Sequence, residues 1–494
     1  MSEQSKSGEG LSQLLLHRRE KLKTLKEKKI DPYPYFFKRT HTTKEILDNF
    51  ERLETEDREV RACGRIISLR SHGKSLFFHL LDGEGKIQVY VKSDEVGEEK
   101  YKFFELFDIG DFIGVRGKVF KTKTGEKSIR AKDFQLLSKS LHPLPEKWHG
   151  LQDKELRYRQ RYLDLITNPE VKDTFLLRTQ ILSAIRKFLD SQGFLEVETP
   201  ILQPIYGGAF ARPFITHHNA LDIDLYLRIA DELYLKRLII GGFEKVYEVC
   251  KDFRNEGMDK NHNPEFTMLE LYQAYADYND IMELGEKLFN FVSLQLFKTN
   301  KIKFQEDSVD LSPPWRRLSF WESIEKYTGV DLYKEEEEKI RELAQDLGLK
   351  SEPSIRIGKV IESIFEAKVQ PNLIQPTFIL DYPVEMSPFA KKHRGKEGLT
   401  ERFEGFIAGF ELMNAFSELN DPLEQRERFE QQAKFRKMGD EEAPVGDEDF
   451  LKAMEYGMPP TGGLGIGIDR LVMFFTNSTS IRDVIFFPQM KPET

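Results

Sequence analysis

Five short strand-like segments follow one another between residues 59 and 140, and they constrain the fold more than any other feature. The segments read VRACGRIISLR, SLFFHLLD, KIQVYVK, DFIGVRGKVFK and KSIRAKDFQLL. Glycine-containing turns separate them, with the sequences HGK, DGEGK and TKTGE. Short strands joined by such turns are typical of a small closed barrel, so we expect one here.

The side chains of this barrel suggest a nucleic-acid ligand. The OB-fold is the obvious barrel of this size, and aromatic residues on its strands can stack on single-stranded bases. Two basic segments, residues 11–30 and 116–132, are candidates for phosphate contacts. The first also reads as an amphipathic helix with a basic face. A purely structural barrel and an ordinary solvated helix are the alternatives.

The composition limits what the rest of the chain can be. Its 494 residues exceed one ordinary core, so two or three domains are expected. The net charge of -9 argues against nonspecific coating of nucleic acid. Only Cys63 and Cys250 are present, which excludes a disulfide framework and favours the reducing cytoplasm. No run of about 18 apolar residues occurs, so we expect no membrane insertion.

The chain after the barrel predicts mixed helices and strands. Residues 140–170 read as a proline-containing hinge followed by a charged helix. Residues 171–190 have helical apolar spacing, and Gly193 is the predicted helix stop. A strand is expected from Leu195 to Thr199, ending at Pro200. Residues 275–400 look like an insertion, with helices expected at 281–297 and 334–347.

The segment KVYEVCKDFRNEGMDKNHNPEFTMLELYQAYAD predicts a long-looped antiparallel hairpin. On its second run, a spacing of two places four side chains on one face: Phe266, Met268, Glu270 and Tyr272. A carboxylate and a phenol that project together can bind an ammonium group. On the first run Arg254 and Glu256 share a face, and such an arginine can grip a carboxylate or phosphate with two hydrogen bonds. The alternative is a surface ladder of ion pairs.

A second polar cluster lies in RFEGFIAGFELMNAFSELNDP, residues 402–422. One strand face carries Asn414, Phe416 and Glu418. Glu404 and Glu411 are out of phase, so they meet only if a turn or bulge intervenes near residues 408–409. Paired carboxylates beside phosphates are natural ligands of Mg²⁺, which prefers oxygen. Ordinary charges on a strand face are the alternative.

In the third segment, TGGLGIGIDRLVMFF, the glycines at positions 463, 465 and 467 alternate with apolar residues. It predicts a strand over which a flat ligand can pass closely. Asp469 is the predicted N-cap of the following helix, with Arg470 on its first turn. The segment is neither a P-loop nor a dinucleotide-binding fingerprint.

These three segments, in this order, resemble the three motifs of class II aminoacyl-tRNA synthetases. The first of the family's motifs corresponds to GFLEVETP, the second to FRNEG…HNPEFTMLE and the third to GLGIGIDR. The upstream barrel is similar to that of the subgroup for aspartate, asparagine and lysine. Within it the chain resembles the lysyl-tRNA synthetases, on GGAFARPFITHHNALDIDLYLRIADELYLKRLIIGGFEKVYEV, RYRQRYLDLI and FSELNDP.

The resemblance implies an α+β fold, with an N-terminal five-stranded OB-fold barrel and a class II catalytic domain whose antiparallel sheet is flanked by helices. It divides the chain into a helical extension (1–58), an OB-fold anticodon-binding domain (59–143), a hinge (144–170) and a catalytic domain (171–494). It also implies a cytoplasmic homodimer that uses ATP, Mg²⁺, L-lysine and tRNA-Lys. Lysine activation needs no side-chain base, because the attacking carboxylate is already ionised.

The resemblance also implies site residues. Arg254 and Arg470 would be catalytic, and ATP would contact Arg254, Glu256, His262, Asn263, Phe266, Glu404, Glu411 and Arg470. Mg²⁺ would bind Glu404 and Glu411. Lysine would contact Gly208, Glu232, Arg254, Glu270, Tyr272, Asn414, Phe416, Glu418 and Gly465. The anticodon would be read by Arg70, Phe77, Gln88 and Glu126, although a shift of one residue in strand register would exchange Phe77 for Phe78.

Three other functions remain open from the sequence. A paralogue that lysylates a protein would lack the barrel. An aspartate enzyme would need cationic residues in place of Glu270 and Glu418. A catalytically dead RNA-binding protein would have no use for Arg254, Glu404, Glu411 and Arg470.

Overall fold

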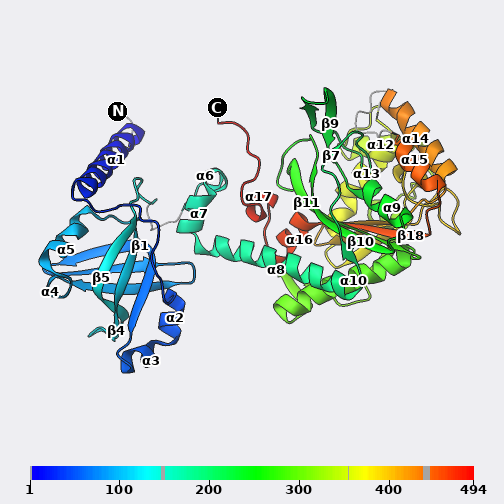
Figure 1. Ribbon diagram of the computed structural model, residues 1–494. Helices are drawn as coiled ribbons and strands as arrows, with labels where there is room; N and C mark the ends of the chain where they lie inside the picture. The colour runs from blue at the N-terminus through cyan, green and yellow to red at the C-terminus, as the bar shows by residue number, and fades with distance from the viewer. Residues whose placement is uncertain (1–2, 146–150, 354, 438–445, 494) are drawn as a thin grey trace. The chain divides into compact units, whose positions relative to one another are not determined.

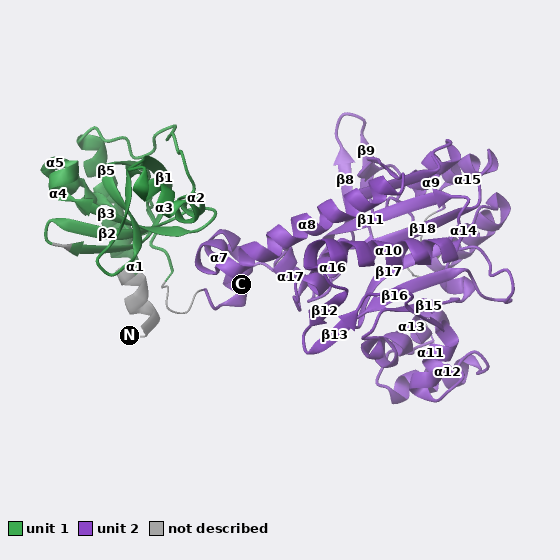
Figure 2. Ribbon diagram, turned by 90° about the horizontal axis from the view of Figure 1, so that it is seen from below, with its two compact units in different colours: residues 1–150 green, residues 151–494 purple. Residues whose placement is uncertain are grey.

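The computed structural model describes residues 3–145, 151–353, 355–437 and 446–493. The chain divides into two compact units, residues 1–150 and 151–494. Figure 2 colours them separately. Among the described residues, no helix has both the length and the apolar character needed to cross a membrane.

The first unit contains the predicted barrel. Its five strands close in the order β1-β2-β3-β5-β4. Their bounds are β1 Glu59–His72, β2 Ser75–Leu81, β3 Lys86–Lys92, β4 Phe112–Lys121 and β5 Lys127–Ser138. Along β2 the buried residues Leu76, Phe78 and Leu80 alternate with half-buried ones, so Phe78 belongs to the barrel core. The five-stranded barrel is confirmed.

Helices surround the barrel. They are α1 Glu3–Glu27, α2 Thr43–Asp48, α3 Phe50–Thr55, α4 Ser93–Val96, α5 Glu98–Lys102 and the short 3₁₀ helix η1 Phe103–Leu106. The predicted basic helix is present as α1, but two of its cations dock it on the barrel. The Arg18 guanidinium donates to the carbonyl oxygens of Ile109 (2.9 Å) and His142 (2.9 Å), and Lys21 pairs with Asp108 (2.8 Å). These two side chains are therefore not part of a solvated basic face.

The second unit is built on an eight-stranded sheet in the order β14-β15-β16-β17-β18-β11-β10-β6. Its pairs are antiparallel except β14–β15 and β10–β6. The bounds are β6 Leu195–Glu196, β10 Lys245–Phe253, β11 Glu265–Ala274, β14 Arg316–Ser319, β15 Thr377–Leu380, β16 Arg402–Ile407, β17 Phe410–Ser417 and β18 Thr461–Gly467. Two small sheets accompany it, made of β7 Leu202–Gln203, β8 Ile215–His218 and β9 Ile223–Leu227, and of β12 Lys301–Phe304 and β13 Asp307–Asp310.

Helices cover this sheet (Figure 1). One face packs against α8 Pro169–Ser191, α10 Tyr278–Phe297 and α16 Ile468–Phe475, whose apolar residues form one core with the strands. Helix α9 Glu232–Ile240 packs through Leu235 and Ile239 on the strand residues Val246 and Tyr272. The remaining helices are α6 Lys154–Arg159, α7 Arg161–Thr167, α14 Pro422–Lys437, α15 Glu448–Glu455 and α17 Ile481–Val484, with the short 3₁₀ helices η2 Gln370–Asn372 and η3 Val384–Met386.

The prediction that residues 275–400 form an insertion is wrong in part. Helix α10 belongs to the central core, and β14 and β15 extend the main sheet. The helices α11 Phe320–Thr328, α12 Glu337–Asp346 and α13 Ile357–Lys368 form a second apolar core, which also includes Ile379 of β15 and Phe406 of β16. The two strands are four residues long, which is too short for their alternation to stand out in the sequence.

The strand predicted from Leu195 to Thr199 is shorter than expected. It ends at Glu196, although the backbone N–H of Val197 still donates to Tyr247 (2.9 Å). Beyond it, the side chain of Glu248 accepts from the backbone N–H of Thr199 (3.1 Å) and replaces the ladder bond. The predicted helix stop at Gly193 is confirmed, since this residue has φ +79° directly after α8.

Candidate active site

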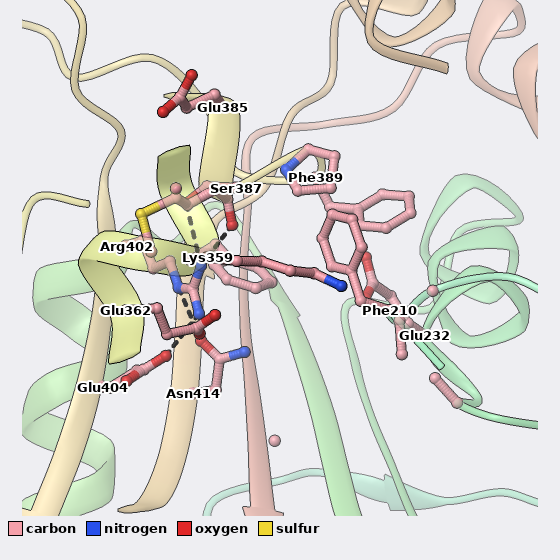
Figure 3. Close-up of a pocket in the computed structure, with 18 of the residues that line it drawn as sticks. Phe210, Glu232, Lys359, Glu362, Glu385, Ser387, Phe389, Arg402, Glu404 and Asn414 are labelled. Carbon is pink, nitrogen blue, oxygen red and sulfur yellow. Dashed lines mark hydrogen bonds and ion pairs between the residues drawn. The ribbon is translucent and has the colours of Figure 1, made fainter. Parts of the chain in front are cut away.

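A cavity of about 990 Å³ lies over β11, β17 and β18 in the second unit. Figure 3 shows residues that line it. All the residues predicted to bind lysine line this cavity: Gly208, Glu232, Arg254, Glu270, Tyr272, Asn414, Phe416, Glu418 and Gly465. The two predicted magnesium ligands, Glu404 and Glu411, line it as well. Segments more than two hundred residues apart in the sequence are thus brought to one place.

The strand β18 in the floor of the cavity contains four glycines among its seven residues. In β18, Gly465 pairs with Glu270 and Gly463 pairs with Tyr272 on the neighbouring β11. A Cβ atom on Gly463 would come within 2.0 Å of Glu418 Oε1 and 2.6 Å of the Tyr272 ring. Gly463 therefore leaves the space that these two side chains occupy. The sequence pattern showed this glycine but did not distinguish its role from that of Gly465.

The acidic end of the cavity is formed by Glu270, Tyr272 and Glu418, all of them buried. The Tyr272 hydroxyl donates to Glu270 Oε2 at 3.0 Å. Burial raises the pKa of the Glu270 carboxyl well above its usual value, and the nearby Asp231 adds to this shift. Burial likewise raises the pKa of Glu418 to about 8. The charges of both carboxylates are therefore incompletely compensated, and a cationic ligand would supply the compensation.

Lys236 is a functional candidate that sequence reasoning missed. Its ammonium group forms ion pairs with Glu232 and Glu418, and its side chain is 1% exposed. Lys236 is on α9, four residues after Glu232, which is the spacing that brings two helical side chains together. This four-residue spacing was the sequence signal from which the contact of Lys236 with Glu232 could have been predicted. Lys236 thus pairs with two carboxylates that line the cavity, although it does not line the cavity itself.

Two more buried carboxylates lie close to Glu270. Asp231 and Asp252 are both fully buried, and oxygens of Asp231, Asp252 and Glu270 lie within 4.8 Å of one another. Arg228 pairs with Asp252 (3.4 Å) and more closely with Glu248 (2.7 Å). Neither carboxylate oxygen of Asp231 has a hydrogen-bond partner among the described residues. Burial raises the pKa of Asp231 well above its usual value, and that of Asp252 to about 6.

The two predicted magnesium ligands reach the cavity from neighbouring strands. A left-handed turn at residues 408–409 and a bulge between Gly405 and Phe406 bring them onto the same side, as the phase argument required. Arg402 forms an ion pair with Glu404 (2.5 Å), and Arg470 with Glu411 (3.3 Å). Burial raises the pKa of Glu404 to about 7, and the charge of Glu411 contributes. Two facing carboxylates that repel each other fit a hard divalent cation.

Arg254 lies at the rim of the floor, but not on a strand as predicted. Strand β10 ends at Phe253, so Arg254 and Glu256 belong to the loop, where Arg254 is half-buried and Glu256 is exposed. The Arg254 guanidinium lies over the Phe266 ring at 5.1 Å, and its buried Nε has no hydrogen-bond partner among the described residues. An unpaired buried donor of this kind suits an anionic ligand.

The other predicted ATP residues surround this region without lining the cavity. His262 Nε2 lies 3.0 Å from the Arg470 guanidinium, which also donates to the backbone carbonyl of Glu411 (3.2 Å). The Asn263 side chain makes hydrogen bonds with the backbone of two other residues. Its amide nitrogen donates to the carbonyl oxygen of Glu265 (2.6 Å), and its oxygen accepts from the backbone N–H of Gln489 (3.2 Å). His262, Arg470 and Glu411 are thus brought together, whereas the Asn263 side chain serves the fold of its loop.

The prediction that Asp469 caps a helix is wrong. Helix α16 begins at Ile468, its N-cap is Gly467, and Asp469 lies inside the first turn. The Asp469 carboxylate instead accepts from the backbone N–H of Thr267 (2.7 Å) and from Arg178 (2.6 Å). It joins β11 to α8. Arg470 is on the first turn, as predicted.

A second cavity of about 730 Å³ lies on the barrel. Its lining includes the four residues predicted to read the anticodon: Arg70, Phe77, Gln88 and Glu126. Phe77 faces this cavity, with Tyr90 4.8 Å away between ring centroids, whereas Phe78 is 1% exposed in the core. Phe77, and not Phe78, therefore has the position that the predicted role requires. Sequence reasoning missed other lining residues: His79, Tyr90, Phe120 and Arg130.

Comparisons with known proteins agree with this geometry. Residues 153–491 match the family described as tRNA synthetases class II (D, K and N), and residues 60–137 match the OB-fold nucleic acid binding domain. The chain is similar to the lysine–tRNA ligase of Pelotomaculum thermopropionicum, with 58% identity over 98% of this chain and 96% of the relative. It is also similar to the lysine–tRNA ligases of Moorella thermoacetica (58% identity; 98% and 99%) and Clostridium kluyveri (56%; 98% and 97%).

Proposed function

Because the chain belongs to the class II tRNA synthetases for aspartate, lysine and asparagine, we propose that it activates L-lysine with ATP and transfers it to tRNA-Lys. The main support for this proposal is the acidic end of the cavity. Glu270 and Glu418 are buried there with raised pKa values, and Tyr272 donates to Glu270. The ε-ammonium of lysine would compensate these charges, whereas the carboxylate of aspartate would be repelled.

The other lysine contacts follow from the same cavity. Glu232 and Gly208 would receive the α-amino group, and Asn414 and Arg254 the carboxylate. Phe416 would pack along the methylene stem, and Gly465 would form the floor beneath it. Support comes from the position of these side chains around one cavity, with the acidic end at Glu418.

In the first reaction the lysine carboxylate attacks the α-phosphorus of ATP and pyrophosphate leaves. Arg254 would stabilise the negative charge that develops on the α-phosphate, and its unpaired Nε supports this role. Phe266 would stack on the adenine, with Glu256 and His262 around the nucleotide and Arg470 near the γ-phosphate. Asn263 would contribute to ATP binding by holding the loop that carries His262. Mg²⁺, held by Glu404 and Glu411, would neutralise phosphate charge. No side-chain base is required, because the nucleophile is ionised.

In the second reaction a ribose hydroxyl at the 3′ end of tRNA attacks the lysyl-adenylate and AMP leaves. We assign anticodon binding to residues 59–143, where Phe77 would stack on a base and Arg70, Gln88 and Glu126 would contact the bases around it. Residues 1–58 would be an extension, 144–170 a hinge and 171–494 the catalytic domain. A cytoplasmic homodimer completes the proposal, on the resemblance to the family.

The test is a pair of assays on the purified chain. ATP–pyrophosphate exchange should respond to lysine alone among the twenty amino acids, and a tRNA-Lys transcript should then be charged with lysine. Exchange with no charging would leave an amino-acid activating enzyme without a tRNA substrate. Exchange that responds equally to aspartate would overturn the proposed specificity.

A further inference from the structure

His79 lines the cavity on the barrel and contacts Glu126, one of the residues assigned to the anticodon. It is on β2, next to Phe77 on the same outward face, and its side chain is 32% exposed. Its Nε2 lies 3.2 Å from Glu126 Oε1, and its Nδ1 lies 2.7 Å from the Ser68 hydroxyl. His79 therefore connects β1 to the turn between β4 and β5.

The contact with Glu126 indicates which nitrogen of the neutral His79 ring carries the proton. An ionised carboxylate can only accept, so Nε2 carries the hydrogen that is donated to Glu126, and Nδ1 accepts from the Ser68 hydroxyl. The Ser68 oxygen also accepts from the backbone N–H of His79 at 3.3 Å. Ser68 thus holds the ring beside Glu126.

The same chain of hydrogen bonds continues through Glu126 to Gln88. Gln88 Nε2 donates to Glu126 Oε2 at 2.7 Å, and the buried Ser128 hydroxyl donates to Gln88 Oε1 at 2.8 Å. Each oxygen of the Glu126 carboxylate therefore has one donor within the barrel. This leaves one Gln88 N–H and the remaining lone pairs of Glu126 for a ligand.

His79 and Gln88 hold the Glu126 carboxylate from its two oxygens. Glu126 is on an exposed turn, Thr122–Glu126, where its backbone N–H donates to the Thr122 hydroxyl (3.0 Å), and its own side chain is 46% exposed. Each of the two donors that hold its carboxylate is itself held by a serine, Gln88 by Ser128 and His79 by Ser68. His79 is the donor to Oε1, so its loss would leave that oxygen without its donor in the barrel.

We propose that His79 is a positioning residue for base recognition, which orients the Glu126–Gln88 pair toward a base edge with a carbonyl oxygen beside an N–H group. Uracil has this edge, and the Gln88 N–H would donate to its carbonyl while Glu126 accepts from its N–H. Cytosine places a ring-nitrogen acceptor against the carboxylate and is disfavoured. The inference rests on the proposed function, because the base is assumed to be that of a tRNA anticodon.

The test compares His79→Leu and His79→Gln with the wild-type chain in tRNA charging. Transcripts of tRNA-Lys are used unchanged or with each anticodon uracil replaced by cytosine. His79→Leu should raise the KM for the unchanged transcript about tenfold, the loss of one hydrogen bond to a charged group, and should reduce discrimination against one cytosine transcript. His79→Gln, which restores an N–H donor, should recover most of both effects.

A double-mutant cycle with Glu126 separates positioning from a general structural effect. In the Glu126→Ala background, His79→Leu should cause little further loss of discrimination, because the group that it positions is gone. Thermal unfolding checks that the barrel of each variant is folded. Additive effects in the cycle, or unchanged discrimination in His79→Leu, would overturn the inference. A wild-type chain that fails to charge tRNA-Lys would overturn the proposed function itself.

Discussion

Lys236 and Glu418 form a buried ion pair at the acidic end of the cavity. The lysine reaches this position from α9, and the glutamate follows directly on β17. The same ammonium group also pairs with Glu232. The enzyme's own cation thus orients two carboxylates that are proposed to bind the two amino groups of the substrate. Under the proposed function, specificity for lysine would depend on a residue that does not line the cavity.

This ion pair predicts a non-additive pattern of stability. Lys236→Met leaves two buried carboxylates without their partner and should lower the free energy of unfolding by about 3–5 kcal/mol. The double variant Lys236→Met/Glu418→Gln should lose less than the sum of the single variants, since it removes both members of one pair. Urea unfolding of the four proteins measures the coupling. Strict additivity would show that the pair contributes nothing as a pair.

Gly463 predicts a steric effect on lysine binding. A methyl group at this position would collide with the Glu418 carboxylate and the Tyr272 ring, so Gly463→Ala should raise the lysine KM in pyrophosphate exchange by about tenfold or more. Gly467→Ala is the matched control on the same strand, because a Cβ atom there would have no heavy atom within 4 Å and the φ of -70° suits alanine. Equal lysine KM values for the two variants would contradict the assignment.

The raised carboxyl pKa values predict that the substrate-free enzyme loses stability as pH rises. Burial raises the pKa of Glu418 from 4.5 to about 8, and it raises that of Asp231 as well. The folded chain therefore binds these protons more tightly than the unfolded chain. Their contribution is complete below about pH 4 and is lost as pH rises toward 8. Melting temperatures between about pH 6 and 8 should fall, and added lysine should reduce the decline.

Asp231→Asn is the companion variant for this pH effect. An amide at this position removes a buried carboxylate that has no hydrogen-bond partner among the described side chains. At about pH 8 the variant should be more stable than the wild type, on the order of 1 kcal/mol, and its melting temperature should depend less on pH. An unchanged pH dependence would show that Asp231 is not part of the titration.

The two neighbouring phenylalanines of β2 predict opposite results. Phe77→Ala should weaken tRNA charging by about 1–3 kcal/mol through lost base stacking, while the barrel stays folded. Phe78→Ala removes a side chain from the barrel core and should destabilise the barrel by about 3–5 kcal/mol. Charging kinetics and thermal unfolding of both variants distinguish these effects. A Phe77→Ala barrel that unfolds as readily as the Phe78→Ala barrel would contradict the assignment.

Much of this fold could be predicted, because several elements have a strong local signal. The barrel strands alternate and end at glycine turns, and the motif strands β11, β17 and β18 alternate over seven to ten residues. Strands β14 and β15 have four residues each, and tertiary pairing rather than local pattern holds them in the sheet. The start of helix α16 at Ile468 also depends on a tertiary contact. Asp469, the predicted cap, instead accepts a hydrogen bond from the backbone of Thr267.

The charged residues of the site were harder to place. Lys236 and Asp231 are of charged residue types that usually lie on the surface. Their burial follows from the packing of α9 against β11. Charge alone could not distinguish them from solvated residues. Arg254 and Glu256 were placed on a strand because their spacing alternates, but that strand ends at Phe253. The alternation of residue types in a sequence does not show at which residue the pairing of two strands ends.

Glu270, Tyr272 and Glu418 are proposed to recognise the ε-ammonium of lysine. The most direct test is ATP–pyrophosphate exchange with lysine and with norleucine, which lacks the ammonium group, in the wild type and in Glu418→Gln. The wild type should favour lysine by about 10²-fold or more. The variant should lose most of this preference through a higher lysine KM, while the KM for ATP stays unchanged. Equal use of norleucine and lysine by the wild type, or an unchanged lysine KM in Glu418→Gln, would contradict the claim.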